Sequence, residues 1–267
     1  MTALLHDAHN HLQDPLLDHY RIDCLARRAA LGIGVQVVNG TCEADWHAVR
    51  ALADSHPDII PAFGIHPWYV DTVSEAWQQN LTGFLDAGGC MGEIGLDRWK
   101  TTGNFNLQRE IFLWQWNEAI QRGIAATVHC LRAWGALMDI IREAPHHSPG
   151  FLLHAYGGPE EMVDEWINLG AYFSFSASFL AEGRERKLKP FQKIPADRLL
   201  VETDAPSMPP PASLLPSTAL LAPDGTRINH PGSIQIACKG LAQVRMQPLD
   251  AVANQVNENF LRLFFGQ

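Results

Sequence analysis

The stretch Ala3-Leu4-Leu5-His6-Asp7-Ala8-His9-Asn10-His11 joins a short apolar run to two histidines that are two residues apart. In a β-strand, residues two apart point to the same side, so His9 and His11 present two imidazoles on one face. Two such nitrogens are half of a metal site. Further residues of metal-binding types follow, or end, other apolar runs: Glu93, His129, His154 and Asp204. Separate strands would deliver all of them to one place, and six ligands exceed what one tetrahedral metal needs.

Short apolar runs rich in β-branched residues alternate with longer amphipathic segments along the chain. The runs predict strands at about residues 3–9, 33–39, 59–65, 90–95, 125–129, 151–155, 171–176 and 199–203. The amphipathic segments predict helices at about residues 16–31, 44–55, 74–87, 106–122, 132–143, 159–169, 184–193, 233–247 and 249–264.

Strict alternation of strand and helix implies parallel strands, and eight of them in about 250 residues favour a closed (β/α)8 TIM barrel. The whole chain, residues 1–267, is expected to form this single barrel, because 46% hydrophobic residues are enough for one large core. An open doubly wound sheet is the alternative. The barrel explains the candidate ligands better, since functional groups of such barrels lie at the carboxyl ends of the strands.

The proline-rich segment 206–231 interrupts the alternation. Proline lacks a backbone N–H and fixes φ, so regular helix or strand is not expected there. A long irregular loop directly after a candidate ligand either shapes, or gates, the substrate pocket or only connects the last strand to the last helices.

Twenty-nine acidic and twenty basic residues give a formal charge of −9, so the chain as a whole does not attract a polyanion. Any contact with a nucleic acid is then expected to be local, at metal ions and a few basic side chains. The five cysteines are scattered, without the spacing of a disulfide framework or a structural zinc site. With no signal-peptide pattern and no membrane-length apolar run, we expect a soluble cytoplasmic protein without an obligate protein partner.

Four imidazoles and two carboxylates suit zinc, manganese or a similar divalent ion, and their number suits two ions bridged by one carboxylate. Glu93 is the expected bridge, because the glycines of Gly92-Glu93-Ile94-Gly95-Leu96-Asp97 leave space beside its carboxylate. A single buried histidine in an apolar run is more often a core residue than a ligand. The joint placement at strand ends therefore carries the metal-site hypothesis.

Several ordered motifs resemble those of the TatD family of metal-dependent hydrolases and deoxyribonucleases, in the amidohydrolase-like superfamily. They are His9-Asn10-His11, Gly64-Ile65-His66-Pro67, Gly92-Glu93-Ile94-Gly95-Leu96-Asp97, Val128-His129, His154 and Glu202-Thr203-Asp204-Ala205-Pro206. The similarity reaches Asn259-Phe260-Leu261-Arg262-Leu263-Phe264, which is similar to the family's terminal helix. The resemblance implies a TIM barrel with a two-metal centre, of zinc, manganese or magnesium.

The resemblance also implies roles for individual residues. The ligands would divide between two metals: His9, His11, Glu93 and Asp204 for one, and Glu93, His129 and His154 for the other. Asp204 would face the attacking water as general base, with Glu93 and His66 as further catalytic residues. His66 would lie close to substrate phosphate or support the site through a hydrogen bond. Glu202 shares a strand face with Asp204 and is expected to support the ligands from behind.

Substrate-binding residues are less well defined by the motifs. Arg132 and Arg98 are candidates for phosphate contact, and Trp68 and Tyr156 for stacking on bases, with Trp99 and Lys100 beside Arg98. Two positions differ from the family's pattern. Arg132 stands one residue later than the family's arginine, and Ala155-Tyr156-Gly157-Gly158 replaces the usual Cys-Phe-Ser-Gly.

The favoured function is metal-assisted hydrolysis of a phosphodiester by a TatD-like deoxyribonuclease, acting as a 3'-exonuclease on single-stranded DNA. A hydrolase of a small-molecule amide, lactone or ester is the first alternative, because a two-metal centre activates water for carbonyl and phosphoryl substrates alike. A non-catalytic binding or scaffolding protein is the second. It would have lost metal ligands, and all six are present in the sequence.

Overall fold

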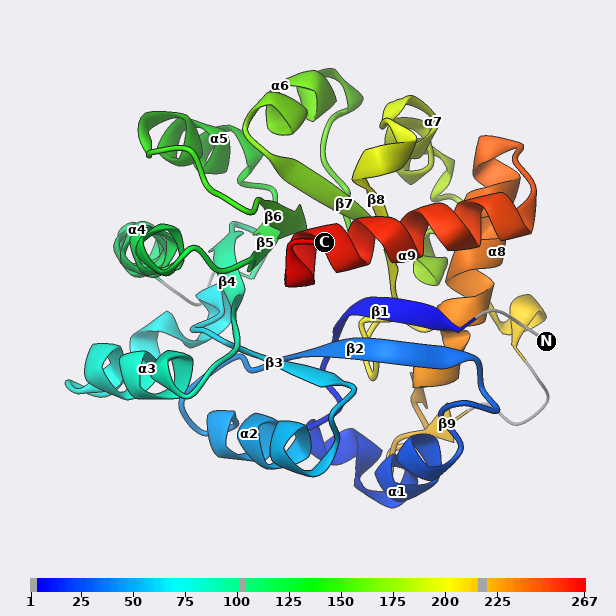
Figure 1. Cartoon of the computed structure of the whole chain (residues 1–267), viewed down its shortest axis with the longest axis horizontal. Helices are drawn as coiled ribbons and strands as arrows, with labels where there is room; N and C mark the ends of the chain where they lie inside the picture. Colours follow the sequence, from blue (N-terminus) through cyan, green and yellow to red (C-terminus); the bar gives the residue numbers. More distant parts are fainter. Residues whose placement is uncertain (1–3, 101–103, 216–219) are drawn as a thin grey trace.

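A computed structural model describes residues 4–100, 104–215 and 220–267 and confirms the predicted barrel of parallel strands (Figure 1). Within those residues all eight predicted strands are present, in chain order around the sheet. They are β1 (Leu5–Asn10), β2 (Ile33–Asn39), β3 (Ile59–Phe63), β4 (Cys90–Asp97), β5 (Ala126–Leu131), β6 (Phe151–Leu153), β7 (Ala171–Ser176) and β8 (Leu199–Glu202). The predicted start of the first strand, at residue 3, lies outside the described residues.

The first and last strands meet at a seam that closes the barrel. The backbone N–H of Asp204 donates to the carbonyl of His9 at 2.9 Å. Below this bond, the buried carboxylate of Asp7 accepts from the backbone N–H of Thr203 at 3.0 Å and from its hydroxyl at 2.6 Å. The open doubly wound sheet is therefore excluded, because its edge strands would not be bonded to each other.

Helices surround the barrel (Figure 1). They are α1 (Asp18–Ala26), α2 (Trp46–Ser55), α3 (Trp77–Asp86), α4 (Phe105–Arg122), α5 (Trp134–Glu143), α6 (Val163–Asn168), α7 (Lys189–Lys193), α8 (Ile234–Arg245) and α9 (Leu249–Phe265). The helix predicted over 184–193 is much shorter than expected, because Pro190 lies in the first turn of α7, which begins at Lys189, and Pro195 follows its end. Among the described residues, no helix has both the length and the apolar character needed to cross a bilayer.

The amino end of the barrel is closed by the last helix. Phe260 and Leu263 of α9 pack in one apolar cluster with Ala8, Val37 and Leu200, which come from three different strands. Figure 1 shows α9 crossing in front of the strands at this end. The carboxyl end is thereby left as the polar mouth.

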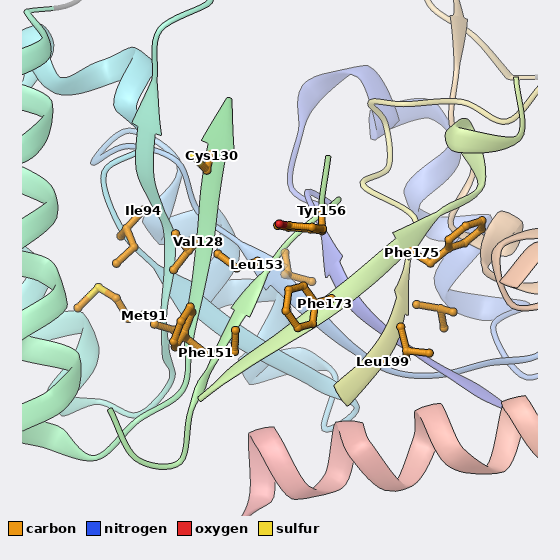
Figure 2. Close-up of a cluster of buried hydrophobic side chains, with 14 of the residues drawn as sticks. Met91, Ile94, Val128, Cys130, Phe151, Leu153, Tyr156, Phe173, Phe175 and Leu199 are labelled. Carbon is orange, nitrogen blue, oxygen red and sulfur yellow. The ribbon is translucent and has the colours of Figure 1, made fainter. Parts of the chain in front are cut away.

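A second and larger apolar cluster lies between the strands and the surrounding helices. Figure 2 shows Met91, Ile94, Val128, Phe151 and Phe173 in this cluster, contributed by neighbouring strands. Truncation of one of its phenylalanines to alanine would cost about 3–5 kcal/mol. The scaffold that positions the strand ends is therefore tightly packed.

The proline-rich segment contains more regular structure than the sequence predicts. β9 (Leu220–Leu221) and β10 (Arg227–Ile228) form a short antiparallel pair, so the expectation of no strand in 206–231 is wrong. The two strands themselves contain no proline, and Pro223 and Gly225, at φ 81°, lie in the turn between them. Asn229 then fastens the segment to the barrel, since its amide donates to the carbonyl of Thr203 at 2.5 Å.

Candidate metal centre

The structure brings the six candidate ligands together at the carboxyl end of the barrel. His9 lies in β1, His129 in β5, and His154 directly follows β6. The strand register explains the placement of Glu93, which lies inside β4 rather than at its end. The pairing of β4 with β5 is irregular between Met91 and Ile94, and such irregularities re-aim a side chain.

Four ligand atoms form one compact group. His9 Nε2 lies 3.2 Å from His11 Nε2, 3.4 Å from Glu93 Oε2 and 3.6 Å from Asp204 Oδ1. His11 Nε2 lies 3.3 Å from Glu93 Oε2 and 3.4 Å from Asp204 Oδ1. Around a metal bound at about 2.0–2.1 Å, tetrahedral ligands would be about 3.3–3.4 Å apart. The group therefore has the spacing that one divalent ion requires.

The hydrogen bonds of His11 also fit a metal ligand. Its Nδ1 lies 2.8 Å from the carbonyl oxygen of Asn39, which can only accept, so Nδ1 carries the proton. Once Nε2 has lost its proton, as metal binding requires, its lone pair faces His9, Glu93 and Asp204. Two imidazole nitrogens at 3.2 Å beside two carboxylates make a donor set that zinc or manganese accepts.

A second group forms around the other oxygen of Glu93. Oε1 lies 2.8 Å from His154 Nε2, 3.0 Å from His129 Nδ1 and 3.4 Å from His66 Nε2. His129 Nδ1 and His154 Nε2 are 3.2 Å apart. Glu93 is only 3% exposed, and its two oxygens face two different sets of histidines. This is the geometry expected of a bridging carboxylate.

Electrostatics at the centre favour cations. Burial opposes the charge of Glu93, but His154, His66 and His9 together hold its pKa well below the ordinary value. Burial likewise opposes protonation of His11, yet Asp204 and Glu93 raise its pKa well above 6.5. The buried carboxylates thus create a negative field, which a divalent ion would neutralise.

His66 differs from the other histidines of the centre. Burial lowers its pKa to about 4, so the ring is neutral at pH 7. Its Nδ1 accepts from the backbone N–H of Trp68 at 3.1 Å, which leaves the proton on Nε2, the nitrogen that faces Glu93. Although His66, Glu93 and His129 lie close enough to hold an ion, a protonated Nε2 cannot coordinate one. His66 is therefore placed as a hydrogen-bond donor.

Asp97 is a residue whose role the sequence reasoning missed. Its Oδ2 lies 3.2 Å from His129 Nε2 and accepts from the indole N–H of Trp68 at 2.6 Å. Its Oδ1 accepts from the backbone N–H groups of Trp99 at 2.6 Å and Lys100 at 3.1 Å. Its position two residues after Gly95, at the end of an apolar run, was the available indication. Asp97 thereby fixes a candidate ligand and the rim loop together.

Glu202 lies behind His154, fully buried. Its Oε1 is 3.5 Å from His154 Nδ1, and its other oxygen accepts from the hydroxyl of Ser174. Glu202 therefore faces His154 from behind without a hydrogen bond between Oε1 and Nδ1, whereas Asp97 lies within hydrogen-bond distance of His129.

Backbone conformation at two positions is specific to the site. A Cβ on Gly95 would lie 1.9 Å from the carbonyl oxygen of His129, so only glycine lets β4 approach β5 this closely. Asp204 has φ 55°, a left-handed conformation that costs a residue with a Cβ of order 1 kcal/mol. Its bond to His9 across the seam holds this conformation.

The predicted substrate-binding residues are not brought together as one group. The guanidinium of Arg98 lies 4.0 Å from the centre of the Phe105 ring, and Arg132 is exposed directly after β5 with φ 56°. Trp68 is partly buried, with the ammonium of Lys100 at 4.0 Å from its ring centre.

Tyr156 is fully buried and does not line the mouth. Its ring packs edge-on against Trp134 at 4.9 Å and Phe173 at 5.0 Å, and its hydroxyl donates to the carbonyl of Pro159. Figure 2 shows Tyr156 among the core side chains. A ring in this position has no free face for a base, so the expectation that Tyr156 stacks on substrate is not retained. The side chain of Trp99, by contrast, is 56% exposed and has a ring face that is open to solvent.

Known proteins resemble this chain along its whole length. It is 24% identical to a protein named uncharacterized metal-dependent hydrolase YabD, from Bacillus subtilis, over 98% of this chain and 99% of that protein. It is 28% identical to the 3'-5' ssDNA/RNA exonuclease TatD of Edwardsiella piscicida, over 90% and 91% of the two chains. The crystal structure of the TatD homolog YJJV from Escherichia coli K12 has the same fold, with a TM-score of 0.89, 23% identity and 99% of both chains covered.

Residues 6–265 match the family described as TatD related DNase. The matched range includes both groups of histidines and carboxylates at the carboxyl end of the barrel. The chain therefore belongs to the TatD related DNase family.

Proposed function

We propose that this member of the family is a deoxyribonuclease that hydrolyses phosphodiesters at the 3' end of single-stranded DNA and holds two divalent ions. One observation carries the proposal: the two oxygens of Glu93 face two separate sets of histidines, at 3.3–3.4 Å on one side and 2.8–3.4 Å on the other. The name of the Edwardsiella relative supports the substrate class.

The ligands we assign fall into the two groups of the centre: His9, His11, Glu93 and Asp204 for one ion, and Glu93, His129 and His154 for the other. When bound, two such ions lower the pKa of water and stabilise negative charge on phosphoryl oxygens. Zinc or manganese suits four imidazoles better than magnesium does.

Asp204 is the proposed general base. Burial opposes its charge, but His11, His9 and His154 together hold its pKa below the ordinary value, so the carboxylate is ionised at neutral pH. It is 6% exposed, which leaves it open to the mouth. An ionised carboxylate in this position accepts the proton of the attacking water.

His66 and the rim residues are proposed to hold the substrate. The Nε2–H of His66 points toward the centre and would donate to a phosphoryl oxygen there. Trp99, and the partly buried Trp68, would stack on bases, while Arg98 and Arg132 would contact phosphates. Because the net charge is −9, DNA would be engaged only at this mouth.

The test compares two substrate classes on metal-reconstituted protein. Wild type loaded with manganese or zinc should shorten a 5'-labelled single-stranded oligonucleotide from its 3' end, and Asp204→Asn should lose that activity while keeping its fold. Isothermal titration of metal-free protein should give two ions per chain. Intact DNA combined with hydrolysis of a lactone, ester or amide panel would instead establish the small-molecule hydrolase, which the acidic net charge favours.

A further inference from the structure

Lys187 lies on the rim of the mouth with its ammonium beside the turn that follows His154. It ends the turn Glu185–Lys187 in the connection between β7 and α7. A Cβ added to Gly157 would lie 2.1 Å from the Nζ of Lys187, so the ammonium occupies the space that glycine leaves open. Gly157 is three residues after His154. A cation thus sits directly beside the strand end that carries a candidate ligand.

This ammonium is partly buried and lacks a compensating charge. No carboxylate of the described residues lies within ion-pair distance of it, whereas Lys193 in the same segment pairs with Asp164 at 2.9 Å. Burial and the nearby charge of Arg184 lower the pKa of Lys187. Glu185 accepts from the backbone N–H of Gly183. A half-buried cation next to another cation is stabilised by any anion that arrives.

The surrounding segment has the opposite charge to the whole chain. Residues 182–193 contain five basic and two acidic side chains, although the chain carries −9. Figure 1 shows α7 next to α6 on the same side of the barrel. In a barrel of eight strands, β7 stands opposite β3, and the loop after β3 carries Trp68. The candidate metal centre lies between the aromatic rim and the basic segment.

We propose that Lys187 binds a backbone phosphate of a DNA strand that crosses the mouth, one or more nucleotides away from the phosphate that is hydrolysed. The inference rests on the proposed function and deepens it. Lys187, whose ammonium occupies the space over Gly157, would then make the protein prefer oligonucleotides to substrates that have a single phosphate. Phosphate is a ligand for which a lysine acts as a point charge on a flexible stem.

The first experiment compares Lys187→Met with Lys189→Met, a matched control that removes the same charge from an exposed neighbour. For single-stranded oligothymidylate, Lys187→Met should raise KM about tenfold, while Lys189→Met stays near wild type. For bis(p-nitrophenyl) phosphate, which has one phosphate, both variants should match wild type. Equal losses on both substrates, or equal effects of the two variants, would overturn the proposal.

The second experiment does not depend on turnover. Binding of a labelled phosphorothioate oligothymidylate, which resists hydrolysis, to the metal-loaded protein is measured by fluorescence anisotropy at several salt concentrations, for wild type and for Lys187→Met. Loss of one phosphate contact should reduce the slope of log K against log salt by about 0.7. Gly157→Ala, which displaces the ammonium but keeps its charge, should weaken binding in the same direction.

The outcomes separate the two proposals. An unchanged slope with Lys187→Met, or no binding by the parent protein, shows that Lys187 is not a phosphate site, whether or not DNA is cleaved. A reduced slope in a protein that cleaves no phosphodiester leaves the Lys187 site standing and rejects the nuclease function. Metal content, measured for each variant, shows that the centre itself is intact.

Discussion

Two buried histidines at opposite ends of the barrel show what makes a histidine a candidate ligand. His147, before β6 at the amino end, is 1% exposed, packs on Trp116 at 4.8 Å between ring centres, and neither of its ring nitrogens has a partner among the described residues. Burial lowers its pKa to about 4. His129, at the carboxyl end, lies between Glu93 and Asp97, which raise its pKa although burial opposes this. Burial alone removes charge from an imidazole, and neighbouring carboxylates create the cation site.

The largest effect is expected from removing Glu93, the carboxylate that both sets of histidines share. Glu93→Gln takes away the one group that faces both sets of histidines, so bound metal and hydrolysis should be lost together. Loss of several kcal/mol of transition-state stabilisation corresponds to about 10²–10⁴-fold in rate. Metal content by mass spectrometry and a nuclease assay measure the two effects. His147→Leu is the matched control and should retain both bound metal and hydrolysis. A Glu93→Gln protein that still binds its full complement of metal would contradict the assignment of Glu93 as the shared ligand.

A smaller effect is expected from the carboxylate that touches a single histidine. The amide of Asp97→Asn has only one acceptor oxygen, whereas both carboxylate oxygens of Asp97 accept hydrogen bonds. The variant therefore loses either the contact with the imidazole of His129 or the hydrogen bond from the backbone N–H of Trp99. Metal affinity should fall about 10–100-fold, as for other hydrogen-bonded partners of ligands. Competition with a chelator of known affinity gives the number. If the affinity is unchanged, the contact at 3.2 Å does not position His129.

His147, the histidine at the amino end, should make the free energy of unfolding depend on pH. The folded pKa of His147, about 4, is below the ordinary 6.5, so the unfolded chain binds more protons between these values. Its contribution is therefore fully present above about pH 6.5 and lost as pH falls toward 4, by about 2 kcal/mol at pH 5 relative to pH 7. Urea unfolding of wild type and His147→Leu at both pH values measures the difference. Parallel profiles would show that His147 does not remain neutral in the folded protein.

The smallest effect should come from Glu202, which faces His154 at 3.5 Å rather than at hydrogen-bond optimum. Glu202→Gln should reduce metal affinity by less than Asp97→Asn does, at or below the tenfold end of the range for such partners. The same chelator competition applies. A larger loss than for Asp97→Asn would reverse the order of importance inferred from the distances.

The fold was predictable because the alternation of strand and helix is visible in the local hydrophobic pattern. The convergence of the candidate ligands was predictable because the carboxyl ends of the strands meet at one end of the barrel. The tautomers of His11 and His66 could not be predicted from the sequence. Each is set by a hydrogen bond to a backbone group that only the folded structure places beside the ring: the carbonyl of Asn39 for His11 and the N–H of Trp68 for His66. The position of Tyr156 was not predictable, because an aromatic residue after a candidate ligand has the same sequence pattern whether it points to the mouth or into the core. Lys187 was missed because its neighbour Gly157 is thirty residues away.

The seam between the first and last strands can form only late in the synthesis of the chain. The bond between Thr203 and Asp7 joins residues 196 positions apart, and Asp204 reaches His9 through the same seam. At about 5–20 residues per second, a ribosome needs roughly 10–40 s to make the chain between them. During that time the nascent protein displays histidines that have no eighth strand to complete their site, so a nuclease centre cannot exist next to the translating messenger until the barrel is almost finished.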